Sequence, residues 1–348
     1  MRYKEEKGLN KQAPTRHAPL NSMLVTNFMM IPSRSFPSSS WKLKACYATI
    51  RRRAFASSST ITPVDLEFDL HAPSGSSTHL NTRKDVGDPL VILHGLFGSK
   101  RNWKSLAKAF SRELHRPVYT LDLRNQGSSP HVPGMTYLHM AADVLHFCET
   151  HKLKHVSLMG HSMGGKVAMA FALNPALPTS LLANLIVVDI APSIGSISDE
   201  FMGYVDAMRA IEAEGFKTRK EADALLQKWE KDPSIRAFLL TNFIPGTTHS
   251  PHGKFQVPLG TLANAIPEIG SFPYKLGERT WEGNTLFIKG QKSKYINRHN
   301  IHTLHDYFPN MELEKLDTGH WVHAEDPHNF RILVANFLNK HSKEYHTS

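Results

Sequence analysis

Residues 156–173 read VSLMGHSMGGKVAMAFAL, and this stretch decides the fold. Residues 156–159 form a short, mostly apolar run that indicates a strand, while residues 163–173 have the small and apolar side chains of a buried helix. Between them, residues 160–164 (GHSMG) fit the pattern G-x-S-x-G. A serine on a tight turn between a strand and a helix presents its hydroxyl for attack, and flanking glycines give the turn room. We therefore predict that Ser162 is a nucleophile.

Apolar runs and helical patterns alternate on both sides of this stretch. Buried strands are expected at residues 89–93, 118–121, 185–190, 285–288 and 313–316, and helices at residues 102–112, 135–151 and 329–338. Residues 64–70 alternate apolar and acidic side chains, as a half-buried strand does. Strands that alternate with helices indicate a doubly wound, mostly parallel sheet, so we predict an α/β fold.

Residues 195–275 interrupt this alternation. Residues 201–214 and 222–231 have helical patterns, residues 235–243 are apolar, and no segment has the pattern of a buried strand. We predict a mostly helical cap inserted between two late strands. Its aromatic residues either face a pocket beneath the cap or hold the cap together: Phe201, Trp229, Phe238, Phe243 and Phe255.

A loop early in the chain supplies a second part of the expected site. Residues 94–98 (HGLFG) directly follow the strand predicted at residues 89–93. When a serine attacks a carbonyl, one backbone N–H from the residue after the serine and one from such a loop stabilise the oxyanion. We assign these donors to Met163 and Leu96, with Phe97 as the alternative to Leu96.

The general base is expected late in the chain, since serine, acid and histidine follow in that order when the serine sits on such a turn. His320 lies in residues 317–321 (DTGHW), after the last predicted strand and before the final helix. We predict His320 as the base and keep His323 as the runner-up.

The acid is less obvious, because the loop after the penultimate strand (residues 290–296) has no carboxylate and carries Ser293 in its place. Asp189 closes the apolar run of an earlier strand. A charge there is costly without a partner, and an imidazolium would be that partner. We predict Asp189 as the acid; the alternatives are Asp306 and a purely structural Asp189.

These segments resemble the α/β-hydrolase superfamily over about residues 89–337. Within it, the chain looks like the mitochondrial α/β-hydrolase-domain group of animals and fungi, which includes the fungal ethanol acetyltransferases. The most specific matches are residues 94–100, 122–131, 160–166, 188–192 and 319–321. The resemblance implies that the acid follows the earlier strand, at Asp189, and that a serine recurs at Ser293. Gln126 departs from the group, where histidine is more usual.

The expected activity is hydrolysis of a carboxylic ester or thioester with a short or medium acyl group, through an acyl-enzyme. One alternative is an alcohol acetyltransferase that makes ethyl acetate from acetyl-CoA and ethanol. The other is a non-catalytic partner of a mitochondrial matrix complex. The substrate would be a small-molecule ester or an acyl-CoA. No cofactor or metal is expected, because such a triad activates its own nucleophile. The sequence leaves the oligomeric state open.

The formal net charge of +10 comes almost entirely from the first 60 residues, which hold eleven Lys and Arg but two Glu. The remaining body is near neutral, which argues against a nucleic-acid-binding protein with a clustered basic face. Between Glu6 and Asp65 there is no acidic residue, a composition typical of a mitochondrial transit peptide. We predict a leader at residues 1–60, cleaved near Phe55, import into the matrix and a hydrolase domain at residues 61–345; the alternative is a disordered basic tail.

Two further features bear on the compartment. No apolar run approaches the roughly 20 residues of a membrane helix, so stable membrane insertion is not expected. Cys46 lies in the leader and Cys148 is the only cysteine of the body, which fits a reducing compartment.

Overall fold

The computed structural model describes residues 61–73, 88–195 and 199–342. The chain divides into two units, Met1–Ser59 and Thr60–Ser348, and all the described residues belong to the second. The predicted leader and its cleavage site lie outside the described residues.

A seven-stranded sheet runs through this unit in the order β1-β3-β2-β4-β5-β8-β9. β1 (Phe68–His71) is antiparallel to its neighbour, and the remaining neighbouring pairs are parallel. The parallel strands are β2 (Leu90–Leu93), β3 (Val118–Leu121), β4 (Val156–His161), β5 (Leu182–Val188), β8 (Asn284–Gly290) and β9 (Met311–Leu316). The predicted α/β fold with a mostly parallel sheet is confirmed.

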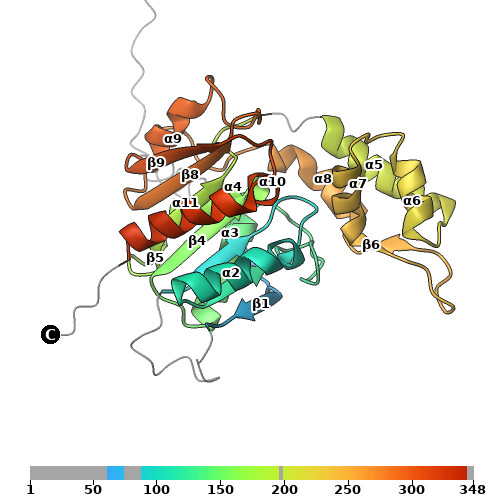
Figure 1. The fold of residues 1–348 in the computed structure, drawn as a ribbon, viewed down its shortest axis with the longest axis horizontal. Helices are drawn as coiled ribbons and strands as arrows, with labels where there is room; N and C mark the ends of the chain where they lie inside the picture. The colour runs from blue at the N-terminus through green and yellow to red at the C-terminus, as the bar shows by residue number, and fades with distance from the viewer. Residues whose placement is uncertain (1–60, 74–87, 196–198, 343–348) are drawn as a thin grey trace, which may run out of the picture. The chain divides into compact units, whose positions relative to one another are not determined.

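Helices cover both faces of the sheet (Figure 1). α2 (Lys104–Leu114) and α11 (Pro327–Lys340) pack on one face, and α3 (Tyr137–Thr150) and α4 (Met163–Ala172) on the other. The side chains of β2 contact both helix layers. Leu90 and Ile92 lie on the side of α2 and α11, while Val91 and Leu93 lie on the side of α3 and α4. Since successive side chains point to opposite faces, a strand covered on both must be apolar throughout.

The cap follows β5 and consists of α5 (Asp199–Glu214), α6 (Arg219–Leu226), α7 (Pro233–Leu239), the 3-10 turn η3 (Leu240–Asn242) and α8 (Leu259–Ile269). It also contains two strands that its sequence did not indicate, β6 (Phe243–Ile244) and β7 (Lys254–Phe255), paired antiparallel. The rings of Phe243 and Phe255 pack with centroids 5.4 Å apart. Strands of two residues are too short to leave an alternating pattern.

The remaining differences from the sequence-based expectation are shifted element ends and two additional short helices. The helix expected at residues 102–112 begins as the 3-10 turn η2 (Lys100–Trp103). α9 (Ile301–Tyr307) and α10 (Val322–Glu325) were not expected. Most important for the site, β5 ends at Val188, so Asp189 is the first residue beyond the strand.

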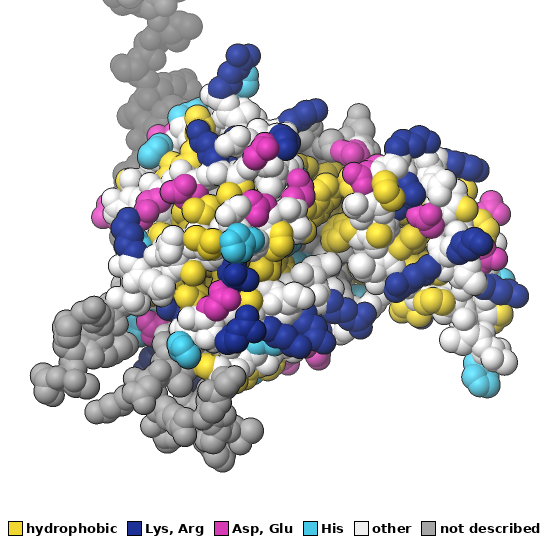
Figure 2. Space-filling model, viewed as in Figure 1, with side chains coloured by type: hydrophobic (Ala, Val, Ile, Leu, Met, Phe, Trp, Pro, Cys, Tyr) yellow, Lys and Arg dark blue, Asp and Glu magenta, His cyan; other side chains and the backbone are white. Residues whose placement is uncertain are grey.

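On the face shown in Figure 2, Lys and Arg side chains are interspersed with Asp and Glu, as the near-neutral composition of the body indicates. Within the described ranges, the helices are all too short or too polar to cross a bilayer.

Candidate active site

Ser162 stands on the turn between β4 and α4, and its backbone is strained. Its φ of 53° and ψ of −118° lie outside the regions that non-glycine residues favour. The tight turn requires a glycine at residue 160, because a Cβ there would clash with the carbonyl oxygen of Gly164 at 2.1 Å. The Ser162 N–H donates to the carbonyl of Val188 at 3.0 Å, which ties the turn to the end of β5.

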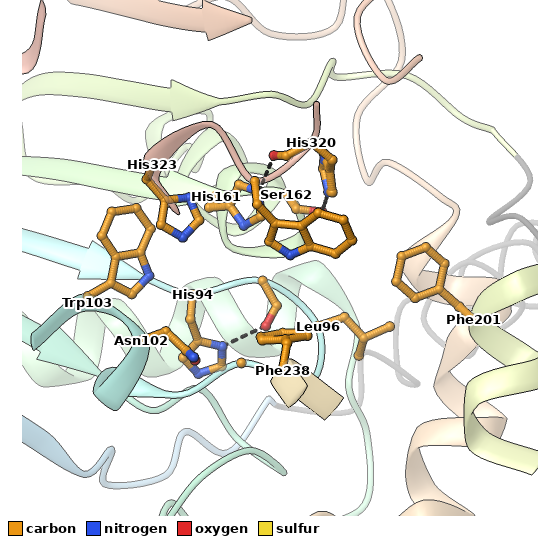
Figure 3. Close-up of a pocket in the computed structure, with 13 residues that line it drawn as sticks. His94, Leu96, Asn102, Trp103, His161, Ser162, Phe201, Phe238, His320 and His323 are labelled. Atoms are coloured by element: carbon orange, nitrogen blue, oxygen red, sulfur yellow. Dashed lines mark hydrogen bonds between the residues drawn. The ribbon is translucent and has the colours of Figure 1, made fainter. Parts of the chain in front are cut away.

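The three side chains predicted as a triad meet at the carboxyl end of the sheet. His320 Nδ1 lies 2.7 Å from Asp189 Oδ2. On the other side of the ring, His320 Nε2 lies 2.9 Å from Ser162 Oγ, as Figure 3 shows. An ionised carboxylate only accepts, so Nδ1–H donates to Asp189 and Nε2 is left to accept the Ser162 hydroxyl proton.

Asp189 is fully buried, and both of its carboxylate oxygens have partners. Oδ2 accepts from His320, while Oδ1 accepts the N–H of Gly290 at 3.0 Å. A buried charge needs such compensation. The φ of Asp189 is 53°, so a second non-glycine residue of the site adopts a left-handed backbone.

The other candidates from the sequence lie elsewhere. Asp306 is exposed on α9. Ser293 lines the pocket described below, where its Oγ accepts the N–H of Tyr295 at 3.3 Å, and the Tyr295 ring packs 4.0 Å from the His320 ring. His323 is buried and stacks on a tryptophan, as described below.

The loop of residues 94–98 lies directly against Ser162. A Cβ added to Gly95 would lie 3.4 Å from the Cβ of Ser162. The loop is shaped by a turn in which the Gly98 N–H donates to the Gly95 carbonyl at 3.0 Å. Met163 is the first residue of α4, so its N–H has no acceptor within the helix. Both segments assigned to the oxyanion therefore border Ser162, and Leu96 lines the two cavities described below.

His94 fixes the conformation of the loop of residues 94–98 through two hydrogen bonds of its buried ring. Its Nδ1–H donates to the Gly95 carbonyl at 2.7 Å, and its Nε2 accepts the N–H of Leu123 at 3.0 Å. Burial lowers the pKa of His94, which favours the neutral ring that this pair of bonds requires.

Two more imidazoles lie behind His320: His161 contacts it directly, and the ring of His323 packs against His161 with centroids 4.6 Å apart. His161 Nε2–H donates to the His320 carbonyl at 2.9 Å, and burial together with the rings of His323 and His320 lowers its pKa well below the usual value. His323 stacks on Trp103 with centroids 4.1 Å apart, and burial followed by the charge of His320 lowers its pKa to about 3. Within the described residues, no group of three or more His, Cys, Asp or Glu side chains is placed to hold a metal ion.

Lys166, one turn beyond Ser162 on α4, is a buried pocket residue that the sequence analysis missed. Its ammonium donates to the carbonyls of Ser193 at 2.9 Å, Ser271 at 2.8 Å and Gly270 at 3.4 Å. These carbonyls lie in the segments that enter and leave the cap, so the lysine ties both ends of the cap to α4. Burial lowers the pKa of Lys166 to about 8. The only signal in the sequence is a lysine within an otherwise small and apolar helix.

A cavity of about 740 Å³ lies between the sheet and the cap and opens onto Ser162 and His320. The cap contributes Phe201 to its wall, whereas Phe238 lines a much smaller cavity beside it. Trp229 is 42% exposed, and Phe243 and Phe255 pack on each other. The sequence left both roles open for these rings, and both occur.

Comparison with known proteins agrees with this architecture. A family model described as the alpha/beta hydrolase fold matches residues 88–327. An abhydrolase domain-containing protein of Schizosaccharomyces pombe is 39% identical over 251 residues, covering 72% of this chain and 92% of the relative. An sn-1-specific diacylglycerol lipase of Danio rerio is 36% identical over 286 residues, covering 80% and 84%.

A probable alcohol acetyltransferase of Saccharomyces cerevisiae is 34% identical over 295 residues, covering 80% of this chain and 84% of the relative. Among solved structures, a marine microorganism esterase superimposes with a TM-score of 0.69 at 32% identity, covering 79% of this chain and 100% of that one. The relatives include the fungal acetyltransferases that the sequence motifs suggested. From its motifs, its sheet and these matches, the chain belongs to the α/β-hydrolase family.

Proposed function

We propose that this protein is a serine-dependent hydrolase of carboxylic esters or thioesters, with Ser162, Asp189 and His320 as its catalytic residues. One observation carries the proposal: the continuous hydrogen-bonded path from Asp189 through His320 to Ser162. In such a path the histidine removes the serine proton, and the aspartate holds the required tautomer and stabilises the imidazolium that forms.

Acylation begins when Ser162 Oγ attacks the substrate carbonyl carbon and its proton passes to His320 Nε2. The N–H groups of Leu96 and Met163 stabilise the oxyanion, assisted by the positive end of α4. The tetrahedral intermediate then collapses, the bond to the leaving alcohol or thiol breaks, and that group takes the proton from His320. The acyl group remains on Ser162 Oγ, and water releases it as the free acid.

A short or medium acyl group suits the pocket between the sheet and the cap. Its volume of about 740 Å³ falls in the range of ordinary small-molecule sites. Apolar side chains such as Ile190 and Ile269 line it together with Tyr137. The lipase and esterase names of the relatives support an ester substrate.

The second candidate is acetyl transfer from acetyl-CoA to a short alcohol, which the similarity to the probable alcohol acetyltransferase favours. Water and alcohol compete for the same acyl-enzyme, so product analysis separates them. Incubation with acetyl-CoA alone and with ethanol should give acetate in both cases if the protein is a hydrolase. Ethyl acetate as the main product would favour the transferase.

Labelling with a fluorophosphonate probe tests the nucleophile. The wild type should be labelled and Ser162→Ala should not, because the probe reacts with an activated serine. Ser234→Ala, which changes an exposed serine on α7, is the matched control and should label like the wild type. Equal labelling of Ser162→Ala would overturn the assignment. An unlabelled wild type would instead favour the non-catalytic partner of a mitochondrial complex.

We propose that residues 1–60 direct the protein into mitochondria and are removed near Phe55. Support comes from their charge, eleven basic against two acidic residues. A fluorescent reporter fused to residues 1–60 should reach mitochondria, whereas a reporter that stays in the cytosol would contradict the proposal.

A further inference from the structure

The loop between β8 and α9, residues 291–300, carries no carboxylate, yet it lies against the proposed catalytic residues. Gly290, the last residue of β8, donates its N–H to Asp189 at 3.0 Å. Five residues further on, the ring of Tyr295 packs on the ring of His320, with centroids 4.0 Å apart and 32° between the planes. The segment that leaves β8 therefore contacts both the proposed acid and the proposed base.

Hydrogen bonds within the loop hold the backbone of Tyr295. Its N–H donates to Ser293 Oγ at 3.3 Å, and its carbonyl accepts from Asn300 Nδ2 at 2.8 Å. The next residue, Ile296, is fully buried and anchors the loop in the core. Ser293, which the sequence singled out without a role, thus helps to place the ring that packs on His320.

The titratable neighbours of His320 differ in what they offer to an imidazolium. Asp189 accepts from Nδ1 at 2.7 Å and supplies a negative charge. The ring of His161, with its centroid 4.7 Å away, stays neutral because burial and the nearby imidazoles lower its pKa well below the usual value. His323 on α10 stays neutral too, because burial lowers its pKa to about 3. Of these three groups, Asp189 alone stabilises a positive charge on His320.

Tyr295 offers a second source of stabilisation that carries no net charge. At 4.0 Å and 32° the two rings meet face to face, and the face of an aromatic ring attracts a cation that lies within about 6 Å. Burial, followed by the charges of Glu200 and Asp189, raises the pKa of Tyr295 to about 12, so its ring remains a neutral phenol. The attraction favours the imidazolium over the neutral imidazole, and only such a difference accelerates a reaction.

We propose that Tyr295 is a positioning residue whose ring face stabilises the imidazolium of His320 in both steps of the proposed reaction. The inference rests on the proposed function. In acylation, His320 Nε2 takes the proton of Ser162; in release of the acid, it takes a proton of the attacking water. Each time the positive charge forms against the Tyr295 ring, and no proton passes to Tyr295. The loop without an acid thus acts on the same histidine as Asp189, through a ring face.

The pH dependence of ester hydrolysis by the full chain tests this role. Tyr295→Leu keeps an apolar side chain against His320 but removes the aromatic face. With a p-nitrophenyl ester, kcat should fall about tenfold, and KM should change little because both steps pass through the imidazolium. The midpoint of the acidic limb of kcat/KM should move about one pH unit lower, since a tenfold loss of stability of the charged form corresponds to one unit.

Two further variants separate the ring from the rest of the side chain and the loop. Tyr295→Phe restores the aromatic face without the hydroxyl and should recover the wild-type midpoint. His299→Leu makes a ring-to-leucine change at an exposed position of the same loop and should keep the wild-type profile. If Tyr295→Leu does not fold, pentafluorophenylalanine at this position keeps a ring but reverses the partial charge of its face, and it should lower the midpoint as well.

The outcomes distinguish the inference from the proposed function. A lowered kcat with an unmoved midpoint in Tyr295→Leu would reduce the ring to packing and overturn the inference. Equal losses in Tyr295→Phe and Tyr295→Leu would also overturn it, because the hydroxyl would then carry the effect. A wild type that hydrolyses the ester no faster than Ser162→Ala overturns the proposed function and this inference with it.

Discussion

The end of the sheet and the cap contribute different kinds of residue to one pocket. The sheet places Ser162 and Asp189 on strained backbones and ties each by hydrogen bonds. In the register of β4 with β5, His161 pairs with Val188, so the next residue of each strand enters the site side by side. The cap contributes half-buried rings such as Phe201 that make no hydrogen bonds through their side chains. We infer that the sheet fixes the reaction and the cap selects the reactants.

The largest expected effect is on the sheet side. Asp189→Asn should lower kcat/KM for a p-nitrophenyl ester by about 10⁴, because the amide favours the wrong tautomer of His320. Asp306→Asn, at the exposed alternative on α9, should retain wild-type kcat/KM. Equal losses of kcat/KM in the two variants would contradict the assignment of Asp189 as the acid that orients His320.

Acid should destabilise the sheet side through its buried imidazoles. Burial lowers the pKa values of His94, His161 and His323 below the usual 6.5, so the unfolded chain binds more protons than the native one. The free energy of unfolding should therefore fall as the pH drops below 6.5, by up to about 1.4 kcal/mol per pH unit for each histidine. Urea titrations between pH 7.5 and 5 measure this slope, and His323→Phe should make it shallower. An unchanged slope would mean that His323 is not kept neutral by folding.

Lys166, at the boundary between sheet and cap, should also make the free energy of unfolding rise with pH, in this case in the alkaline range. The pKa of Lys166 is about 8 in the native protein and near 10.5 when unfolded, so the unfolded chain again holds more protons between these values. Relative to Lys166→Met, the wild type should gain up to about 1.4 kcal/mol of stability per pH unit from pH 8 to 10. Denaturant titrations of both proteins at pH 7.5, 9 and 10 check this, and a constant difference would contradict it.

The smallest effect is expected from the cap alone. Phe201 borders both cavities and stacks on Phe97 with centroids 6.3 Å apart. Phe201→Ala should shift the preference from two-carbon toward eight-carbon acyl esters by about tenfold, as a widened pocket does. Trp229→Ala, at the exposed cap position, should keep the wild-type profile. A loss of all activity in Phe201→Ala would contradict the inference that the cap only selects the reactants.

The sheet was also the more predictable region, for a physical reason. A glycine-flanked serine and a carboxylate after an apolar run are local patterns, and the fold brings the two side chains that they single out within hydrogen-bond distance of one histidine. Lys166 left almost no pattern, because its partners are backbone carbonyls 27 to 105 residues away. The position of His323 depends on stacking against Trp103, and β6 and β7 are too short for any periodicity. Such features follow from tertiary packing alone.

The tie made by Lys166 also bears on how the cap can diverge. Its ammonium contacts the carbonyls of Ser193, Gly270 and Ser271, not their side chains. Every amino acid offers the same carbonyl, so this anchor places no demand on which residues lead into or out of the cap. A protein with such an anchor can accumulate substitutions throughout its cap, and so acquire new substrate preferences, without releasing the cap from the helix that carries the nucleophile.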